Sequence, residues 1–166
     1  LVPREEVKVG SNYEKMGQEL NPVADVYFDN SKANRIIGEL GKGLRLSTDA
    51  FTRGRLIVSA VCTGMAMRLC DEMTAYAKER DVFKHQLVQG LIAEAVAKTF
   101  AARSSVIEAA KNLTPLNSSC AKLICTNAAN EVADNAVQVL GGYGDMRGHI
   151  VEEWQASRPL SHRSRK

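Results

Sequence analysis

The sequence predicts a mostly α-helical protein, in which a short β segment precedes an antiparallel bundle of three long helices that lacks a fourth. Three observations support this fold class. Apolar residues recur with a helical period from about residue 44 onward. No proline interrupts residues 44–80, and Pro115 falls between two periodic stretches. The first 41 residues instead contain turn signals and short alternating runs, so they belong to a different kind of structure.

The β segment is expected within residues 1–41. Residues 23–28 alternate Val23, Asp25 and Tyr27 with Ala24, Val26 and Phe28, which is typical of a half-buried strand. A turn at Asp29-Asn30 and a glycine-containing break at residues 38–43 follow it. Because two or three strands are not stable alone, we expect them to pack on the helices, on another chain, or on sheet outside this sequence.

The three helices are expected at residues 44–80, about 86–112 and about 118–140, the last ending at Gly141-Gly142. The inward face of the first comprises Ile57, Val61, Met65, Leu69, Met73 and Tyr76. That of the second comprises Leu87, Leu91, Ala95, Val106 and Ala110. That of the third comprises Ala121, Cys125, Ala128, Val132, Ala136 and Val139. Short connections between long helices favour an antiparallel bundle.

Further apolar residues lie outside these faces, namely Leu56, Val58, Ile92 and Ile124. A bundle of three helices leaves such residues exposed. We therefore expect a fourth helix or a partner subunit to cover them.

The composition of the 166 residues argues against several classes of protein. The net charge is only +3, much of it from Arg158, Arg163, Arg165 and Lys166, and aromatic residues make up 5%, so no nucleic-acid-binding surface is predicted. No signal peptide and no run long enough to span a bilayer is found. The four cysteines and three histidines lack the spacing of a metal site, so no metal is predicted, and the cysteines are expected to be buried thiols.

Residues 136–144, Ala-Val-Gln-Val-Leu-Gly-Gly-Tyr-Gly, end a helix in glycines beside the side-chain amide of Gln138. Together with Thr52-Arg-Gly-Arg-Leu56 and Tyr76-Ala-Lys-Glu-Arg80, this stretch resembles the carboxy-terminal part of the FAD-dependent acyl-CoA dehydrogenases. The resemblance covers residues 1 to about 154. It implies that residues 1–41 are the end of the middle β domain and residues 42–154 the C-terminal helical bundle.

Members of this family use FAD to remove the α and β hydrogens of an acyl-CoA thioester. By this resemblance, Arg80 matches an arginine that pairs with the FAD pyrophosphate, commonly across a subunit boundary, and Gln86 a glutamine that contacts the nucleotide. Gln138, Gly141 and Gly142 match a stretch along the cofactor of a neighbouring subunit, and Arg55 matches an arginine close to the acyl-CoA. Without the resemblance, the arginines are solvated helix residues and the glycines a helix stop.

No catalytic residue is predicted, because the chain departs from the family where its base is found. Some members carry their catalytic glutamate just before the arginine that Arg55 matches, and this chain has Gly54 there. The commoner place is a Tyr-Glu-Gly-Thr motif after the last glycine turn, and this sequence has no such motif. Glu152 and Glu153 are the nearest substitutes and are expected to be solvated. The loop after Phe83 is short, and Asp145 and Gly148 are unusual for the glycine turn. Residues 155–166 diverge into a basic tail that is expected to be disordered.

Two hypotheses for the function remain open. The chain is part, or a shortened form truncated before the catalytic glutamate motif, of an acyl-CoA dehydrogenase, and is inactive alone. Its partners are then FAD, the acyl-CoA substrate of the complete enzyme, and further copies of itself or a complete family member. Alternatively, it is a non-catalytic oligomerisation module or an inactive truncated product. The resemblance implies a mitochondrial matrix or bacterial cytoplasmic location without deciding between them.

Overall fold

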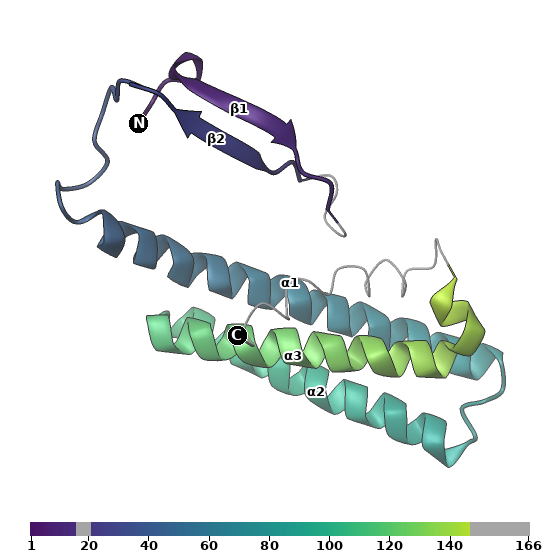
Figure 1. Ribbon diagram of the computed structural model, residues 1–166. Helices are drawn as coiled ribbons and strands as arrows, with labels where there is room; N and C mark the ends of the chain where they lie inside the picture. The colour runs from purple at the N-terminus through teal and green to yellow at the C-terminus, as the bar shows by residue number, and fades with distance from the viewer. Residues whose placement is uncertain (16–20, 147–166) are drawn as a thin grey trace.

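The structure is a computed structural model that describes residues 1–15 and 21–146. Its elements are, in chain order, the 3-10 turn η1 (Arg4–Glu6), strands β1 (Val7–Asn12) and β2 (Ala24–Phe28), helices α1 (Gly43–Glu79), α2 (Gln86–Lys111) and α3 (Pro115–Leu140), and the 3-10 turn η2 (Gly141–Asp145). Figure 1 shows the hairpin on one side and the helices on the other.

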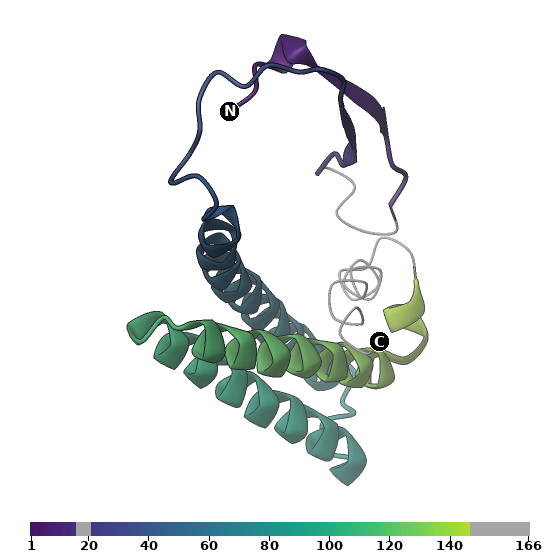
Figure 2. The same cartoon turned by 60° about the vertical axis from the view of Figure 1, so that its left-hand side comes forward.

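The helices form the predicted antiparallel bundle, in which α3 packs against both α1 and α2 (Figures 1 and 2). The end of α1, the start of α2 and the end of α3 therefore lie at the same end of the bundle. Helix α3 begins three residues earlier than predicted. Pro115 occupies its first turn, and the Thr114 hydroxyl accepts a hydrogen bond from the Asn117 N–H at 3.1 Å. Thr114 is thus the cap, and Ser118 is a buried residue inside the helix.

The predicted inward face of α3 is confirmed, because every one of its six residues is buried. The predictions for the other two helices were partly wrong. On α1, Leu69 and Met73 are buried, but Ile57 and Val61 are exposed. On α2, Leu87 is 77% exposed and Ile92, which was assigned to an outer face, is only 7% exposed.

The predicted faces failed because small residues occupy the places where the helices touch. The buried side of α1 also includes Ser59, Cys62, Thr63, Ala66 and Ala77. On α2, Ala95, Ala102 and Ala109 are buried, whereas Ala110 is exposed. Helix axes approach more closely where the side chains between them are small, so larger apolar residues such as Leu87 are turned outward.

The expectation of four buried thiols was wrong for one of them. Cys62, Cys70 and Cys125 are buried, but Cys120 is exposed on α3. Burial raises the pKa of the Cys62, Cys70 and Cys125 thiols. No group of His, Cys, Asp and Glu within residues 1–15 and 21–146 is arranged to hold a metal ion.

The β segment is an antiparallel hairpin, in which Val7 lies opposite Phe28 and Val9 opposite Val26. It stands apart from the bundle in both views (Figures 1 and 2). The predicted strand at residues 23–28 forms, but Val26 and Phe28 are exposed rather than half-buried. The apolar face of this hairpin is therefore left uncovered by the part of the chain that the structure describes.

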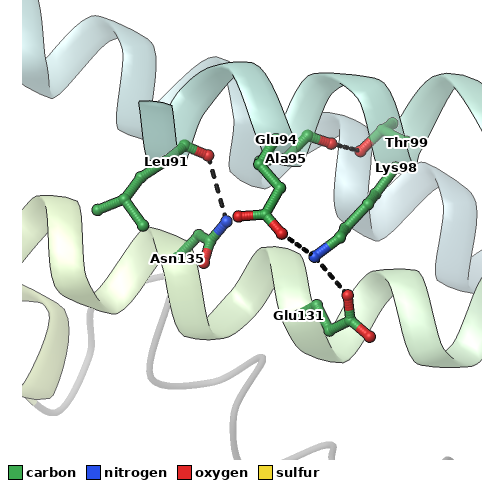
Figure 3. A network of polar contacts seen from close by, with 7 residues as sticks. All are labelled: Leu91, Glu94, Ala95, Lys98, Thr99, Glu131 and Asn135. Atoms are coloured by element: carbon green, nitrogen blue, oxygen red, sulfur yellow. Dashed lines mark hydrogen bonds and ion pairs between the residues drawn. The ribbon is translucent and has the colours of Figure 1, made fainter. Parts of the chain in front are cut away.

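A polar network joins α2 to α3 beside the core (Figure 3). The Lys98 ammonium forms ion pairs with Glu94 of its own helix and with Glu131 of α3. The Asn135 amide donates a hydrogen bond to the carbonyl oxygen of Leu91 at 3.2 Å. These contacts fix the register of the two helices about two turns from the end at which α3 meets η2.

Residues 147–166 and 16–20 lie outside the described residues. The predictions for Gly148, Glu152, Glu153 and the tail at residues 155–166 fall there and stay predictions. Among the helices that the structure does describe, none combines the length and the apolar character that crossing a membrane requires.

Candidate functional site

An open cleft of about 830 Å³ lies where α1 ends and where α3 passes into η2. It is lined by Tyr76, Glu79, Arg80, Asp81, Val82, Val139, Leu140, Gly141, Gly142, Tyr143 and Met146. The cleft contains three of the residues singled out in the sequence: Arg80, Gly141 and Gly142. Arg80 is separated from the two glycines by about sixty residues of chain, and the fold brings them to one place.

The end of α1 determines where Arg80 lies. The backbone N–H of Arg80 donates to the carbonyl oxygen of Tyr76 at 3.0 Å. The N–H groups of Val82 and Phe83 both donate to the carbonyl oxygen of Ala77 at 3.0 Å. Asp81 adopts a φ of 54°, the left-handed conformation that commonly ends a helix and that aspartate tolerates. This turn leaves the Arg80 side chain exposed beside the cleft.

Arg80 forms no ion pair with a carboxylate within residues 1–15 and 21–146, although Glu79 and Asp81 line the same cleft. Two acidic residues flank it in sequence, but Asp81 forms an ion pair with Lys84 instead. The guanidinium lies over an aromatic ring, with its Cζ atom 5.8 Å from the centroid of Tyr143. Arg80 is thus a partly restrained cation that can still meet an anion.

The opposite wall of the cleft is formed by η2, which folds back onto α3. Gly141 begins this turn with a φ of 58°. Gly144 is buried, and a Cβ atom at this position would lie 3.0 Å from the Cα atom of Val137. A side chain at this position would therefore require the turn or α3 to shift by a few tenths of an ångström. Gly142 has neither a positive φ nor any atom within 4 Å of a Cβ, so nothing in the described chain requires a glycine there.

Two aromatic residues of the cleft were not among the sequence-predicted site residues. The rings of Tyr76 and Tyr143 have centroids 6.0 Å apart and are inclined at 54°. Tyr76 was expected in the inward face of the first helix, and Tyr143 had no predicted role. The signal that was available is the four-residue spacing of Tyr76 and Arg80, which places both on one face of α1.

The remaining predicted residues lie outside this cleft. Gln138 is exposed on α3, three residues before Gly141. Gln86 opens α2 and lines a second hollow of about 550 Å³ with Leu87, Gly90, Leu91 and Glu94. Arg55 is half-buried on α1, about 37 Å along the helix axis from Arg80. The three residues therefore stand apart from the cleft that holds Arg80.

Comparison with known proteins places this geometry in context. The profile of the family described as "Acyl-CoA dehydrogenase, C-terminal domain" matches residues 41–161. The cyclohexane-1-carbonyl-CoA dehydrogenase of Geobacter metallireducens is 33% identical over 159 residues, which cover 88% of this chain and 42% of that protein. The caffeyl-CoA reductase–Etf complex subunit CarC of Acetobacterium woodii is 34% identical, over 89% of this chain and 42% of that protein.

Solved structures agree with the sequence relatives. A glutaryl-coenzyme A dehydrogenase in complex with glutaryl-CoA has a TM-score of 0.88 at 28% identity, covering 93% of this chain and 42% of the other. An acyl-CoA dehydrogenase from Geobacillus kaustophilus has a TM-score of 0.86 at 27% identity, over 96% of this chain and 44% of that one.

The three-helix bundle and the short hairpin before it have the fold that these dehydrogenase structures share. This chain belongs to the acyl-CoA dehydrogenase family, and most of it matches the C-terminal domain of that family. It spans about two fifths of the length of the relatives it matches.

Proposed function

We propose that the chain contributes part of an FAD-dependent acyl-CoA dehydrogenase, and that its cleft holds the pyrophosphate of an FAD molecule bound mainly by a neighbouring subunit. The observation that carries this proposal is the meeting of Arg80 with Gly141 and Gly142 in one cleft. Arginine presents paired donors to phosphate, and a backbone without side chains allows an extended ligand to approach closely.

The residues present fit the cofactor. Arg80 forms no ion pair with any described carboxylate, and no contact or backbone angle within the described chain requires a glycine at the exposed Gly142. The aromatic and apolar side chains of Tyr76, Val139 and Met146 add a surface that suits the rest of a nucleotide. FAD, when bound, supplies the redox chemistry by accepting the β hydrogen of the substrate as hydride. The role of this chain's residues is to bind and orient it.

The other predicted contacts belong to the same proposal. Gln86 at the start of α2 and Gln138 near the end of α3 both lie at the cleft end of the bundle, where each can reach a different part of a long cofactor. Arg55, far along α1, is proposed to meet the acyl-CoA rather than FAD. Gly54 beside it has no side chain that could abstract a proton. We therefore propose that the chain has no dehydrogenase activity of its own.

Oligomerisation is the second part of the proposal. Large apolar residues are exposed on all three helices: Phe51 and Ile57 on α1, Phe100 on α2, and Leu116 on α3. Exposed apolar side chains of this size favour a partner that covers them. We propose a second copy of the chain or a complete family member as that partner. Light scattering tests this, and a monodisperse monomer that does not associate with a relative would contradict it.

FAD binding is tested by titrating the cofactor into the purified chain and following the quenching of flavin fluorescence. Arg80→Ala is expected to weaken binding strongly and Arg80→Lys to restore it only in part, because lysine lacks the paired donors. The matched control is Arg103→Ala, since Arg103 is an exposed arginine on α2. Equal affinity of the Arg80→Ala and Arg103→Ala variants would overturn the assignment of the cleft.

Activity is tested separately by adding acyl-CoA to the chain with FAD and following the bleaching of the flavin absorbance. No bleaching is expected from the chain alone. Bleaching by the chain alone would contradict the proposed lack of independent activity. If the chain associates with a relative but binds no FAD, it is the non-catalytic helical module of the alternative hypothesis.

A further inference from the structure

The aromatic ring of Tyr143 occupies a central place in the cleft. It contacts two residues of α1 that lie one turn apart, Tyr76 by its ring and Arg80 by its guanidinium. Tyr143 itself belongs to η2, so this stack joins the end of α1 to the turn that follows α3. The ring is half exposed and so also faces the cleft.

The backbone next to Tyr143 packs against α3. The next residue, Gly144, packs closely against Val137 and Leu140. A Cβ atom at this position would lie 3.0 to 3.3 Å from atoms of these two residues. Met146 N–H donates to the Tyr143 carbonyl oxygen at 3.4 Å. The packing of Gly144 and the hydrogen bond from the Gly141 N–H to the Val137 carbonyl oxygen anchor the backbone around the ring on α3, so the ring position follows from the fold rather than from a ligand.

A ring contact suits an arginine that must bind an anion. A carboxylate partner would restrain the side chain but would also neutralise it and use its donors. The face of an aromatic ring attracts the cation while leaving its full charge in place. Without such restraint, the long arginine side chain would lose much of its rotamer freedom when it binds a phosphate, which weakens binding.

We infer that Tyr143 is a positioning residue for Arg80: its ring pre-orients the guanidinium to receive a phosphate group at the end of α1. This inference rests on the proposed function for the identity of the ligand, and on the two ring contacts for the mechanism. Tyr143→Phe keeps the ring and is expected to behave as the wild type. Tyr143→Leu removes the ring face while keeping an apolar side chain of moderate size.

The stack is tested without any ligand, by NMR of the Arg80 Nε–Hε group in the full chain. A proton above an aromatic ring is shielded, so the wild type and Tyr143→Phe should show this resonance upfield of its free position. Tyr143→Leu should return it to the free position. The resonance is assigned by its loss in Arg80→Lys. The same free position in the wild type and in Tyr143→Leu would overturn the inference.

The consequence for binding is tested by titrating inorganic pyrophosphate, and in a second series FAD, into the same variants. Tyr143→Leu is expected to weaken the affinity of both by about two- to fivefold, the range of an exposed cation–π contact. Phe100→Leu, which removes an exposed ring of α2, is the matched control and should have no effect. Thermal melting confirms that each variant is folded.

The two proposals fail in different ways. If Tyr143→Leu loses the ring shift but binds pyrophosphate and FAD as tightly as the wild type, the positioning role is wrong and the proposed function stands. If the ring shift is present but neither pyrophosphate nor FAD binds to the wild type, the phosphate-binding function of the cleft is wrong, and the stack is a structural contact only.

Discussion

The two halves of the helical bundle differ in whether large side chains are buried among the small ones. The half next to the cleft, called the cleft half here, buries large residues such as Leu69, Met73 and Ile92 in one cluster. In the far half, toward the α2–α3 connection, the buried cluster consists of Cys62, Ala102, Cys125 and Ala128. The candidate site therefore lies over the part of the bundle that buries the larger side chains, whereas the far half brings its helices together through small residues.

Hydroxyl groups complete the interior of the far half. Ser59, Thr63 and Thr126 are buried, and each donates to the carbonyl oxygen four residues earlier in its own helix, at 2.7 to 2.8 Å. These bonds satisfy the hydroxyls within one helix and add no bond between helices. Between helices of the far half, the Cys125 thiol donates to the carbonyl oxygen of Ala102 at 3.4 Å.

The largest expected effect comes from truncating a large residue of the cleft half. Met73→Ala should lower the free energy of unfolding by about 2–5 kcal/mol, because it leaves a cavity in a filled core. Cys125→Ala in the far half should cost only about 1 kcal/mol, since it removes one buried sulfur atom and its weak hydrogen bond to the Ala102 carbonyl oxygen. Chemical denaturation measures both, and equal losses would contradict the distinction between the two halves.

A second prediction concerns the two glycines of η2. Gly144→Ala should destabilise the chain by about 1–3 kcal/mol, because the new Cβ meets the backbone of Val137 and the turn must shift. Gly142→Ala meets nothing and should leave the melting temperature of the free chain almost unchanged. It should nevertheless weaken FAD binding in the titration described above. An equal loss of stability in both variants would show that η2 is not anchored at Gly144.

The polar network at the edge of the cleft half should contribute less than its interior. Lys98→Met removes both ion pairs, and the loss should be smaller than for Gly144→Ala because the groups are near the surface. Arg68→Met, which removes one exposed pair within α1, is the control and should cost less still.

The same network predicts a dependence on pH. Its hydrogen bond to Lys98 lowers the pKa of Glu94, so this contribution is present above the ordinary glutamate pKa and is lost as the pH falls through the lowered value. Hydrogen bonds to Glu131 and Glu94 raise the pKa of Lys98, so its contribution is lost only as the pH rises above the ordinary lysine range. The stability difference between wild type and Lys98→Met should therefore shrink in acid and stay constant near neutrality.

The last prediction compares the reactivity of an exposed thiol with that of the buried thiols in the far half. Iodoacetamide should modify the exposed Cys120 first under native conditions. Cys62 and Cys125 should react only after unfolding, because burial raises the pKa of both thiols and blocks access to them. Mass spectrometry of the labelled peptides distinguishes them. Rapid native labelling of Cys125 would show that the far half opens readily.

Much of the fold could be predicted from the sequence, because helix boundaries depend on local signals. Pro115, the glycines at residues 141–142 and the period of the apolar residues located the helices to within a few residues. The inward face of α3 was also correct throughout. The faces of α1 and α2 were less predictable: a rule that places the largest apolar residues inside fails where Ala, Ser and Cys make the helix contacts and Leu87 faces outward.

The candidate site was predictable only in part. Arg80 and the glycines could be selected from their resemblance to a family pattern, but nothing local states that they share a cleft. Tyr143 was overlooked because its partners, Tyr76 and Arg80, lie more than sixty residues earlier in the chain.

The helices, their order and the places where they end follow from backbone preferences within a few residues of chain, so the amino-acid sequence alone is enough to locate them. Which apolar side chains are buried and which polar ones share a cleft depends on the folded arrangement. Both depend on how closely α1, α2 and α3 approach, and that distance is set by the sizes of side chains that meet from different helices.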